Sequence, residues 1–417
     1  MRRVVVTGLG AVTPLGHSAE ESWSNLCRGR SGIRPITQFD TSGLRTRIAG
    51  QVCDFEPAAF MDPRLADRMD RFVQLGVAAT RQAVQHARLP IDGTSRWAER
   101  VAVVMGTTFG GVLQVEQGCE RVAAGAATRL SPFFVPGALG NMAAGVTAMT
   151  LGARGPNLTV NQACASGTVA IGLGLRLLRA GEADAVVAGG CEAALSRVLY
   201  CGYHALKATT ARNHEPERAS RPFDRERDGF VPAEGAAALV LEPWDLAERR
   251  GAPILAELAG YGTGCDAYHL TRPDPSAEGC ARCMQLALED AGVPPEEVDH
   301  VNAHGTATRL NDTVEARAIR QVFGSAAARL PVTANKSMIG HAIGAAGAIE
   351  AVFSVLTLRD GVIPPTVNYE YPDPECELDC VARAPRRAGV RTVLSNSFAF
   401  GGINASLVFR GVTRSVA

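Results

Sequence analysis

Apolar residues follow two periods in turn along the chain, and this alternation predicts strands and helices. Short runs that are apolar at nearly every position predict buried strands. They cover residues 4–6, 101–105, 158–160, 185–188 and 236–241 in the first half, and 254–260, 298–302, 332–334, 393–397 and 405–409 in the second. Apolar residues three or four positions apart predict helices at 19–26, 62–87, 140–151, 165–180, 279–291, 314–323 and 340–359. Strands alternating with helices indicate mixed α/β sheets with helices on their faces.

Glycines and charged residues predict where the chain turns or reaches the surface. Gly8 and Gly10 predict a turn after the first strand, and Gly189 and Gly190 predict one after the strand at 185–188. The segment 28–39 has no clear period and is interpreted as a loop. The segment 204–235 is rich in Arg, Asp and Glu, so we expect it to wrap around the surface.

Two predicted helices, 165–180 and 340–359, are small and apolar almost all round. A helix without a polar face is a buried helix. The two have similar lengths and compositions and occur at comparable places in the two halves. We therefore expect an internal duplication, with repeats at 1–252 and 253–417 and these helices packed together at the centre.

Composition narrows the class of protein. Of the 417 residues, 46% are hydrophobic and 20% are charged, which is ordinary for a globular protein. The 42 basic and 42 acidic residues balance, so nothing indicates nucleic acid. No signal peptide and no membrane-spanning run is recognised, and the 11 cysteines form no disulfide framework, so a cytoplasmic protein is expected. Cys280 and Cys283 have metal or redox spacing but lack a second pair, so no metal site is predicted.

Cys164 is the first candidate for chemistry. It lies between the strand that ends at Val160 and the buried helix that follows. Unpaired backbone N–H groups and the positive end of the helix dipole gather at such a position. Both favour a thiolate, which is the nucleophilic form of cysteine. A buried structural cysteine is the alternative for this residue taken alone.

Three more segments place polar groups at strand ends, where α/β sheets build their sites. They are residues 302–308, which contain His304; 335–341, which contain Lys336 and His341; and the glycine-rich loop 395–404. A cysteine with two histidines allows two interpretations. One histidine could act as the base of a hydrolase. Alternatively, two neutral histidines could stabilise an enolate, as an oxyanion hole does.

The motifs 164–167 (Cys-Ala-Ser-Gly), 304–308 (His-Gly-Thr-Ala-Thr), 336–341 (Lys-Ser-Met-Ile-Gly-His) and 400–402 (Phe-Gly-Gly) resemble, in order and spacing, those of the β-ketoacyl-acyl-carrier-protein synthases. The likeness extends over nearly the whole chain. Within the family, the chain resembles the elongating members, which are similar to ketoacyl synthase II. The likeness implies a thiolase-like α/β fold: two duplicated halves in a five-layered αβαβα arrangement, usually dimeric. The first half would carry the nucleophile and the second both histidines.

The resemblance within this family is divided. Residues 130–136 are similar to the elongating synthases of bacterial fatty-acid synthesis. Residues 208–213, 219–224, 308–312 and 373–379 look more like the catalytic ketosynthase subunit of type II polyketide synthases. That subunit pairs with a chain-length factor, a homologue lacking the cysteine. We favour the polyketide ketosynthase, with ketoacyl synthase II and a non-catalytic chain-length-factor or scaffold subunit as alternatives.

The family's chemistry implies a role for each matching residue. Cys164 would take the acyl chain, the N–H groups of Cys164 and Phe400 would hold the oxyanion, and His304 and His341 would stabilise the enolate formed when malonyl-acyl carrier protein loses carbon dioxide. Lys336 would pair with Glu350 and organise the histidines, with Asp312 and Glu315 supporting the same loop. Thr306 and Thr308 would bind the pantetheine amides. No bound cofactor or metal is implied, since substrates arrive on the phosphopantetheine arm of acyl carrier protein.

Two more sets of residues follow from the resemblance. The acyl pocket is expected at Thr107, Thr108, Phe109, Phe133, Phe134 and Tyr203. The docking patch for the acidic carrier protein is expected at Arg64, Arg68, Arg129 and Lys207. The sequence departs from the family at Ala399, where glycine usually precedes the Phe400 gate, and at Arg309, where many fatty-acid synthases have proline. A homodimer and a heterodimer with a chain-length factor both remain open.

Rival enzymes are disfavoured by particular residues. The initiating condensing enzymes have a Cys-His-Asn site and the degradative thiolases a second cysteine, whereas His341 occupies that position here. A hydrolase is disfavoured because no Gly-x-Ser-x-Gly elbow is present.

Overall fold

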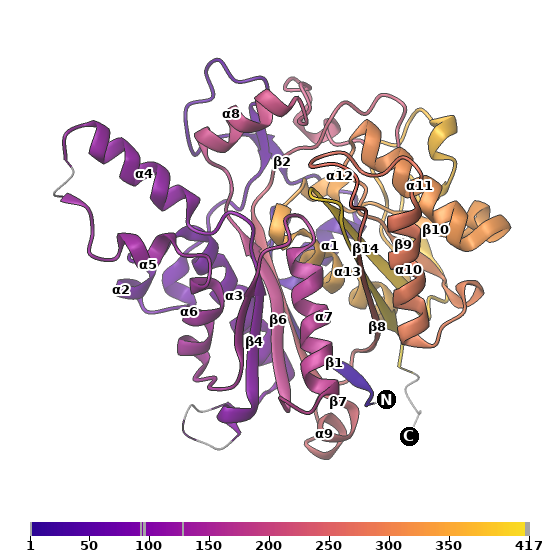
Figure 1. Ribbon diagram of the computed structural model, residues 1–417, viewed down its shortest axis with the longest axis horizontal. Helices are drawn as coiled ribbons and strands as arrows, with labels where there is room; N and C mark the ends of the chain where they lie inside the picture. The colour runs from indigo at the N-terminus through magenta and orange to yellow at the C-terminus, as the bar shows by residue number, and fades with distance from the viewer. Residues whose placement is uncertain (1, 92–93, 95–96, 127–128, 413–417) are drawn as a thin grey trace.

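The computed structural model describes residues 2–412, apart from 92–93, 95–96 and 127–128, and Figure 1 shows how its elements are arranged. The first half contains β1 (Val4–Val12), α1 (Ala19–Cys27), β2 (Ile33–Pro35), β3 (Ile48–Gly50), α2 (Pro63–Ala66), α3 (Arg71–Ala87), β4 (Val101–Gly106), α4 (Val112–Ala123), α5 (Phe134–Ala138), α6 (Met142–Leu151), β5 (Asn157–Val160), α7 (Ser166–Arg179), β6 (Ala185–Glu192), α8 (Arg197–Leu206), β7 (Gly235–Pro243) and α9 (Trp244–Arg249).

The second half contains β8 (Ala256–Cys265), α10 (Glu278–Ala291), β9 (His300–Asn302), α11 (Arg309–Phe323), β10 (Pro331–Thr333), α12 (Lys336–Ile339), α13 (Ala346–Asp360), β11 (Val362–Ile363), β12 (Asp379–Cys380), β13 (Arg386–Arg387), β14 (Thr392–Ala399) and β15 (Ile403–Arg410). The predicted alternation of strands and helices is confirmed.

The two halves repeat one sheet topology. The strand order is β1-β7-β6-β4-β5 in the first half and β8-β15-β14-β9-β10 in the second, with β12 added at the edge. β7 in the first half and β15 in the second are antiparallel to both of their neighbours. The remaining pairs of neighbouring strands within each half are parallel. This identity of order and direction confirms the internal duplication. Because β1 also pairs with β8, the two mixed half-sheets form one continuous eleven-stranded sheet.

Helices cover the half-sheets in layers. α3 and α6 pack on the outer face of the first half-sheet, α10 and α11 cover that of the second, and α7 and α13 lie between the two. The central core includes apolar side chains of both middle helices, such as Ile171 and Phe353. Separate outer cores lie under α3 and under α10. The five-layered arrangement is therefore present. Within the described residues, no helix has the length and apolar character needed to cross a membrane.

The predicted turns at 8–10 and 189–192 are wrong, because β1 and β6 continue through these residues. Their glycines serve close packing instead. A Cβ atom at Gly10 would lie 1.9 Å from the carbonyl oxygen of Ala79 in α3, and one at Gly189 would lie 2.1 Å from that of Ala237 in β7. Glycine within a strand permits this close approach of another backbone.

The expectation that 204–235 wraps the surface is also wrong for much of the segment. The side chains of Arg221 and Arg227 are only 2% exposed, and residues 230–235 are buried. Arg221 pairs with Asp224 at 3.2 Å and Arg227 with Asp373 at 2.5 Å. Charged side chains become buried where partners satisfy them, so this segment ties the two halves together.

Three other predicted elements have different bounds. The predicted helix at 62–87 is two helices, because Asp70 caps α3 by accepting a hydrogen bond from the N–H of Phe72. The predicted helix at 340–359 begins only at Ala346, so His341 lies in irregular backbone between α12 and α13. The predicted loop at 28–39 contains the short strand β2.

Candidate active site

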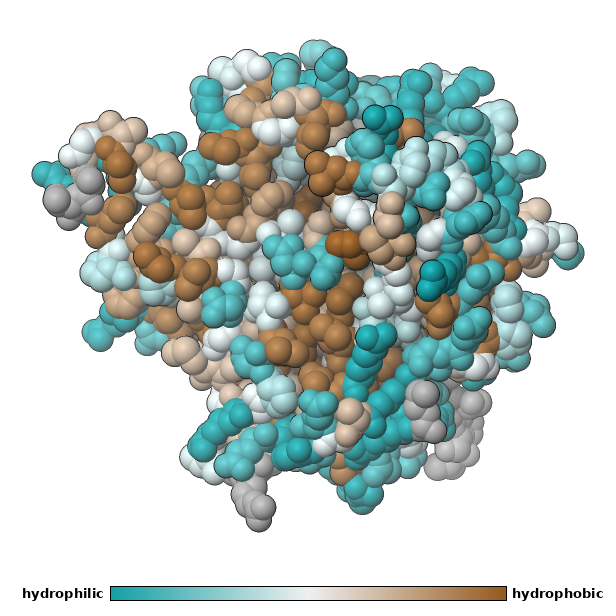
Figure 2. Space-filling view, viewed as in Figure 1, coloured by the Kyte–Doolittle hydropathy of each residue, from teal (hydrophilic) through white to brown (hydrophobic). Residues whose placement is uncertain are grey.

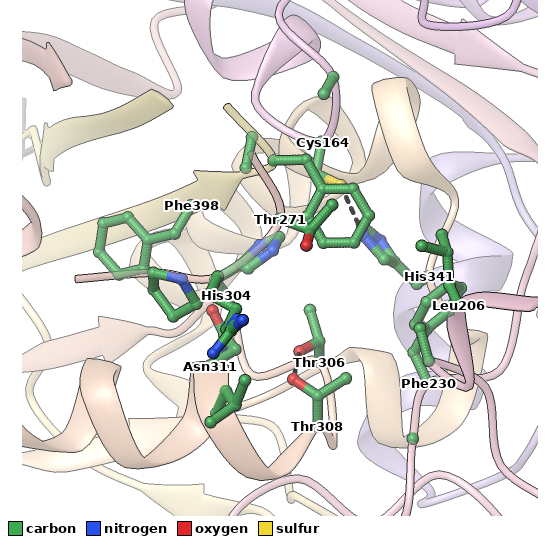
Figure 3. A pocket seen from close by; sticks show the side chains of 18 of the residues that line it. Cys164, Leu206, Phe230, Thr271, His304, Thr306, Thr308, Asn311, His341 and Phe398 are labelled. Atoms are coloured by element: carbon green, nitrogen blue, oxygen red, sulfur yellow. Dashed lines mark hydrogen bonds between the residues drawn. The ribbon is translucent and has the colours of Figure 1, made fainter. Parts of the chain in front are cut away.

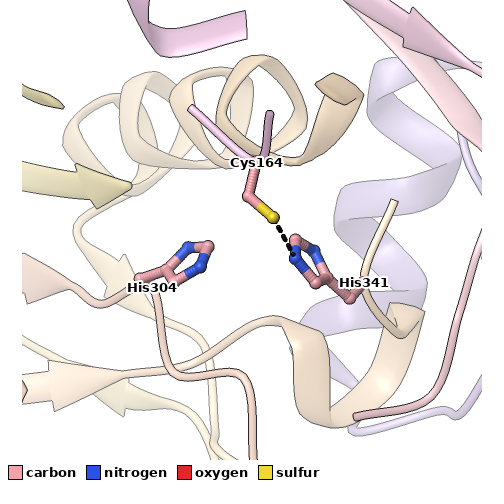
Figure 4. A group of neighbouring side chains, drawn as sticks. All are labelled: Cys164, His304 and His341. Carbon is pink, nitrogen blue, oxygen red and sulfur yellow. Dashed lines mark hydrogen bonds between the residues drawn. The ribbon is translucent and has the colours of Figure 1, made fainter. Parts of the chain in front are cut away.

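Three candidate reactive side chains meet at one end of the sheet. Cys164 immediately precedes α7, His304 follows β9, and His341 lies between α12 and α13. Figure 4 shows the three side chains converging: Sγ of Cys164 is 3.1 Å from Nε2 of His341, and the two imidazole centroids are 5.3 Å apart. They line a cavity of about 680 Å³, shown in Figure 3. One half of the duplicated chain therefore supplies the sulfur, and the other supplies both imidazoles.

The backbone turn at Cys164 is held from two sides. Ala163 has φ +46°, a left-handed conformation that is costly for a residue other than glycine. Its carbonyl oxygen accepts hydrogen bonds from the hydroxyl of Ser166 at 2.7 Å and from that of Thr108 at 3.0 Å. The adjacent sulfur is thereby fixed in the cavity.

Burial opposes the thiolate form of Cys164 that a position before a helix N-terminus favours. Burial raises its pKa to about 12, although the Lys336 ammonium and the backbone N–H groups of Cys164 and Phe400 pull it down. Burial also holds the pKa of His341 well below its usual value. At neutral pH both partners are therefore uncharged, and the thiol donates to Nε2 of His341. The two backbone N–H groups that face the sulfur are those predicted to form the oxyanion hole.

Lys336 determines which nitrogen of His304 carries a proton. Its ammonium lies 2.7 Å from the carbonyl oxygen of His304, 2.5 Å from Oε1 of Glu350 and 3.3 Å from Nδ1 of His304. An ammonium only donates hydrogen bonds, so Nδ1 accepts and Nε2 keeps its hydrogen. Burial, reinforced by the charge of Lys336, holds the pKa of His304 well below its usual value. His304 thus presents an uncharged N–H donor at a fixed position.

His341 differs because its tautomer is not fixed. Its Nδ1 is buried and has no hydrogen-bond partner within the described residues. Phe230 packs edge-on against the ring, with centroids 5.5 Å apart. Nε2 of His341 can therefore accept a proton in one step and donate in another, whereas Nε2 of His304 only donates.

The predicted supporting carboxylates lie under the His304 loop. The two oxygens of Glu315 accept the N–H groups of His304 and Gly305, both at 2.8 Å. Burial raises the pKa of Glu315 to about 7 despite these bonds. Asp312 accepts from the N–H of Phe223 at 2.8 Å and lies 3.8 Å from the Arg227 guanidinium. The loop is thus held from α11.

The predicted pantetheine-binding and gate residues line the cavity. The hydroxyls of Thr306 and Thr308 lie 2.9 Å apart on one wall (Figure 3). Phe400 lies at the opening and is 43% exposed. It is followed by Gly401 and Gly402 at φ +85° and +72°. Ala399 is the last residue of β14, so the aromatic ring is carried by a short loop anchored on a strand.

The residues predicted for the acyl pocket divide into two groups. Thr108, Phe109 and Tyr203 line the cavity, whereas Thr107, Phe133 and Phe134 do not. The side chain of Thr107 points to the carboxylate of Glu192, at 3.3 Å. Phe133 and Phe134 lie on the α4–α5 arm, which projects from the body of this chain (Figure 1). The arm carries them away from the cavity of their own chain, and their role in the acyl pocket, which the family resemblance implies, stays a prediction.

The predicted docking residues divide in the same way. Lys207 ends α8 and lies at the cavity, whereas Arg64, Arg68 and Arg129 are exposed and do not line it. The guanidinium of Arg68 stacks over the Phe133 ring at 4.2 Å. The cations that surround the opening together with Lys207 are Arg45, Arg272 and Arg309.

Sequence reasoning missed several functional candidates. The cavity lining also includes Leu206, Phe230, Thr271, Leu310, Asn311, Ile343 and Phe398. Glu192 lies fully buried between the cavity wall and the His341 loop. The available signal was a glutamate directly after an apolar strand. A buried charge is costly unless it is paired, so such a residue is expected to have partners.

The donor atoms of Cys164, His304 and His341 lie within 4.8 Å of one another and could together hold a metal ion. The ammonium of Lys336, 3.3 Å from Nδ1 of His304, opposes a cation at this position by charge repulsion. The arrangement suits a developing negative charge better than a positive one.

Comparisons with known proteins agree with this geometry. Residues 1–247 match the family "Beta-ketoacyl synthase, N-terminal domain", and residues 255–370 match "Beta-ketoacyl synthase, C-terminal domain". The chain is 46% identical over 411 residues to a 3-oxoacyl-[acyl-carrier-protein] synthase 2 of Coxiella burnetii, covering 99% of both chains. A solved structure of the ishigamide ketosynthase/chain length factor is 40% identical with TM-score 0.91, covering 99% of this chain and 100% of that one. A type II PKS acyl-carrier protein in complex with its ketosynthase bound to the hexaketide gives 34% identity and TM-score 0.91, with 99% and 100% coverage.

Proposed function

Because this chain belongs to the β-ketoacyl synthase family, we propose that it lengthens an acyl chain held on Cys164 by decarboxylative Claisen condensation with malonyl-acyl carrier protein. The product is a 3-ketoacyl chain two carbons longer, attached to the carrier. The observation that carries the proposal is the pair of uncharged imidazoles facing one thiol across a cavity built from both halves.

In the first step, the Cys164 sulfur attacks the thioester carbonyl of the acyl carrier. Nε2 of His341 lies 3.1 Å away and takes the thiol proton as the sulfur–carbon bond forms, so no free thiolate has to form in the buried site. The N–H groups of Cys164 and Phe400 hold the oxyanion. The pantetheine sulfur leaves with the proton from His341, and the acyl chain remains on Cys164.

In the second step, malonyl-carrier protein loses carbon dioxide and leaves an enolate on its thioester. Nε2–H of His304 donates to the enolate oxygen. His341 donates as well, from the tautomer with its hydrogen on Nε2, because Nδ1 has no partner within the described residues that would hold the hydrogen there. The enolate carbon then attacks the acyl carbonyl and releases the Cys164 sulfur as a thiolate, which takes up a proton from solvent to restore the thiol. Each such donor contributes about 10²–10³ in rate.

Intact-protein mass spectrometry tests both steps. Wild-type protein with acyl-carrier protein should gain the acyl mass, and Cys164→Ala should not. His304→Ala should gain the acyl mass but release little carbon dioxide from malonyl-carrier protein. Failure of every acyl donor to load the wild-type chain, alone or with a partner subunit, would overturn the proposal.

We further propose that the pathway is type II polyketide synthesis. The similar solved structures include a polyketide ketosynthase with its carrier and the ishigamide ketosynthase/chain length factor. Fatty-acid elongation is the second candidate, because the Coxiella relative at 46% identity is a 3-oxoacyl-[acyl-carrier-protein] synthase 2. Repeated extension on one carrier without reduction would support the polyketide pathway. A single extension that needs a ketoreductase before the next would support fatty-acid elongation.

A second, similar subunit is the expected structural partner. β5 is the outer strand of the first half-sheet, and its Leu158 is 41% exposed. Met149 of α6, which packs on β5, is 73% exposed, and Val135 and Leu139 in and after α5 are 62% and 46% exposed. Figure 2 shows apolar side chains on this face, along the α4–α5 arm and across the middle. An unpaired edge with a broad apolar surface favours a dimer, with an identical chain or a chain-length factor. Light scattering of the chain alone and after co-expression separates the two.

Docking of acyl carrier protein is proposed at the opening of the cavity. Lys207, Arg272 and Arg309 surround it, and acidic carriers are attracted to such a cluster. Reversing Lys207 to Glu should raise the KM for the carrier and leave kcat nearly unchanged.

A further inference from the structure

The two halves hold their cavity loops by the same device. In the second half, Glu315 accepts the N–H groups of His304 and Gly305 with one carboxylate oxygen each. In the first half, Glu192 accepts the N–H groups of Thr108 and Phe109, at 2.8 and 3.2 Å, also with one oxygen each.

The two pairs of N–H groups occupy equivalent places in the repeat. Gly106 of β4 pairs with Gly190 of β6, and Asn302 of β9 pairs with Ser395 of β14. Thr108 and His304 each lie two residues beyond these paired glycine and asparagine positions. Glu192 therefore supports the nucleophile's side of the cavity as Glu315 supports the His304 side.

Glu192 has a further contact that Glu315 lacks. Its Oε2 also accepts the N–H of Gly344, at 3.1 Å, from the loop that carries His341. The hydroxyl of Thr107 is a fourth donor, at 3.3 Å. Every one of these bonds uses the carboxylate as an acceptor, and the side chain is fully buried. One carboxylate thus joins the first-half loop beside Cys164 to the second-half loop of His341.

The His341 loop and the turn before Cys164 are conformationally strained. Ile343 has φ +44°, and a β-branched residue there is a genuine outlier. Ala163, next to Cys164, has φ +46° and is held by the Thr108 hydroxyl. Such strain persists only where the surroundings fix it. The Glu192 carboxylate bonds the backbone of Thr108 on one side and of Gly344, next to Ile343, on the other.

We infer that Glu192 is a positioning residue that sets the separation of Cys164 and His341 for acylation. The inference rests on the proposed function. Acylation needs the thiol proton to pass to Nε2 of His341, so it depends on the 3.1 Å separation of these atoms. Enolate formation uses His341 as well, but its other donor, His304, is held by Glu315 and Lys336 independently of Glu192.

Glu192→Gln tests this inference, with Glu242→Gln as the matched control. Glu242 is equally buried, lies on the neighbouring strand β7, and bonds to Thr7 and Arg250 at the opposite end of the strands. We expect Glu192→Gln to slow acylation of Cys164 about ten- to hundredfold, as small misplacements of reacting groups do. The KM for acyl-carrier protein should be nearly unchanged. Glu242→Gln, at a comparable melting temperature, should acylate at the wild-type rate.

Ile343→Gly provides a readout that loss of stability alone would not change. Glycine adopts positive φ freely, so the strained loop no longer needs Glu192. The cost of Glu192→Gln in acylation rate should therefore be several-fold smaller in the Ile343→Gly background. Equal costs in both backgrounds, or acylation of folded Glu192→Gln at the wild-type rate, would overturn the inference. Failure of the wild-type chain to acylate would instead remove the proposed function.

Discussion

Replacing Lys336 by methionine tests how the structure controls His304. Methionine keeps the length of the side chain but removes the ammonium, which has three partners: the carbonyl oxygen and Nδ1 of His304, and Glu350. Without that donor, Nδ1 can hold the proton itself, and Nε2 then cannot donate to an enolate. Loss of one such donor costs about 10²–10³ in rate.

The cost in stability follows from the burial of the ion pair. The side chains of Lys336 and Glu350 are each 1% exposed, and breaking such a pair costs about 3–5 kcal/mol. Burial already raises the pKa of Glu350 to about 7, so at neutral pH this carboxyl can take up a proton and keep the loss near the lower limit. Lys336→Met combined with Glu350→Gln should recover most of the stability, because no charge is left buried.

The assay separates the two half-reactions. Acylation of Cys164 is followed by intact mass, and release of carbon dioxide from malonyl-carrier protein by coupled assay. Both variants should acylate far better than they decarboxylate, and the double variant should recover folding without recovering decarboxylation. Wild-type decarboxylation by folded Lys336→Met would refute the argument that this lysine sets the tautomer of His304.

Three further outcomes are expected. Alkylation of Cys164 by iodoacetamide should still rise between pH 7 and 9, because burial raises the pKa of the thiol to about 12; a plateau by pH 8, read on the Cys164 peptide, would contradict this. Burial lowers the pKa of His300 to about 3 in the folded protein. As the pH falls below 6.5, this histidine therefore takes up a proton in the unfolded chain but not in the folded one, and the free energy of unfolding decreases. Denaturant unfolding at pH 7 and pH 5 should show that His300→Gln removes about 2 kcal/mol of this loss. Ala399→Gly should speed acylation about two- to fivefold in single-turnover assays, equivalent to about 0.5–1 kcal/mol, because glycine lets the Phe400 loop move more freely. An unchanged rate would mean that this loop does not limit entry of the acyl chain.

The reactive residues were predictable because each is embedded in a short motif whose order and spacing along the chain resemble those of one family. Cys164, His304 and His341 therefore needed no knowledge of long-range contacts. The duplication was predictable from two apolar helices, since a helix without a polar face has to be buried. The start of α13 was not, because residues 340–345 are as small and apolar as the helix that they precede.

The errors share a physical cause: they concern what lies opposite a residue in space. Gly10 resembles a turn residue until the backbone of α3 is placed against it. Arg227 resembles a surface residue until Asp373, far along the chain, supplies its partner. Local patterns contain none of this information.

The shared strand order of the two halves also says something about the origin of the molecule. A gene that encoded only one half would have produced a protein that buries its apolar helix, the forerunner of α7 and α13, against a second copy. Both copies would have presented the same strand ends to one cleft on the two-fold axis. Fusion of two such genes would have freed each copy from supplying both sides of the cleft. One copy could then carry the nucleophile and the other the imidazoles. Glu192 and Glu315 support equivalent loops of the two halves from different places in the fold.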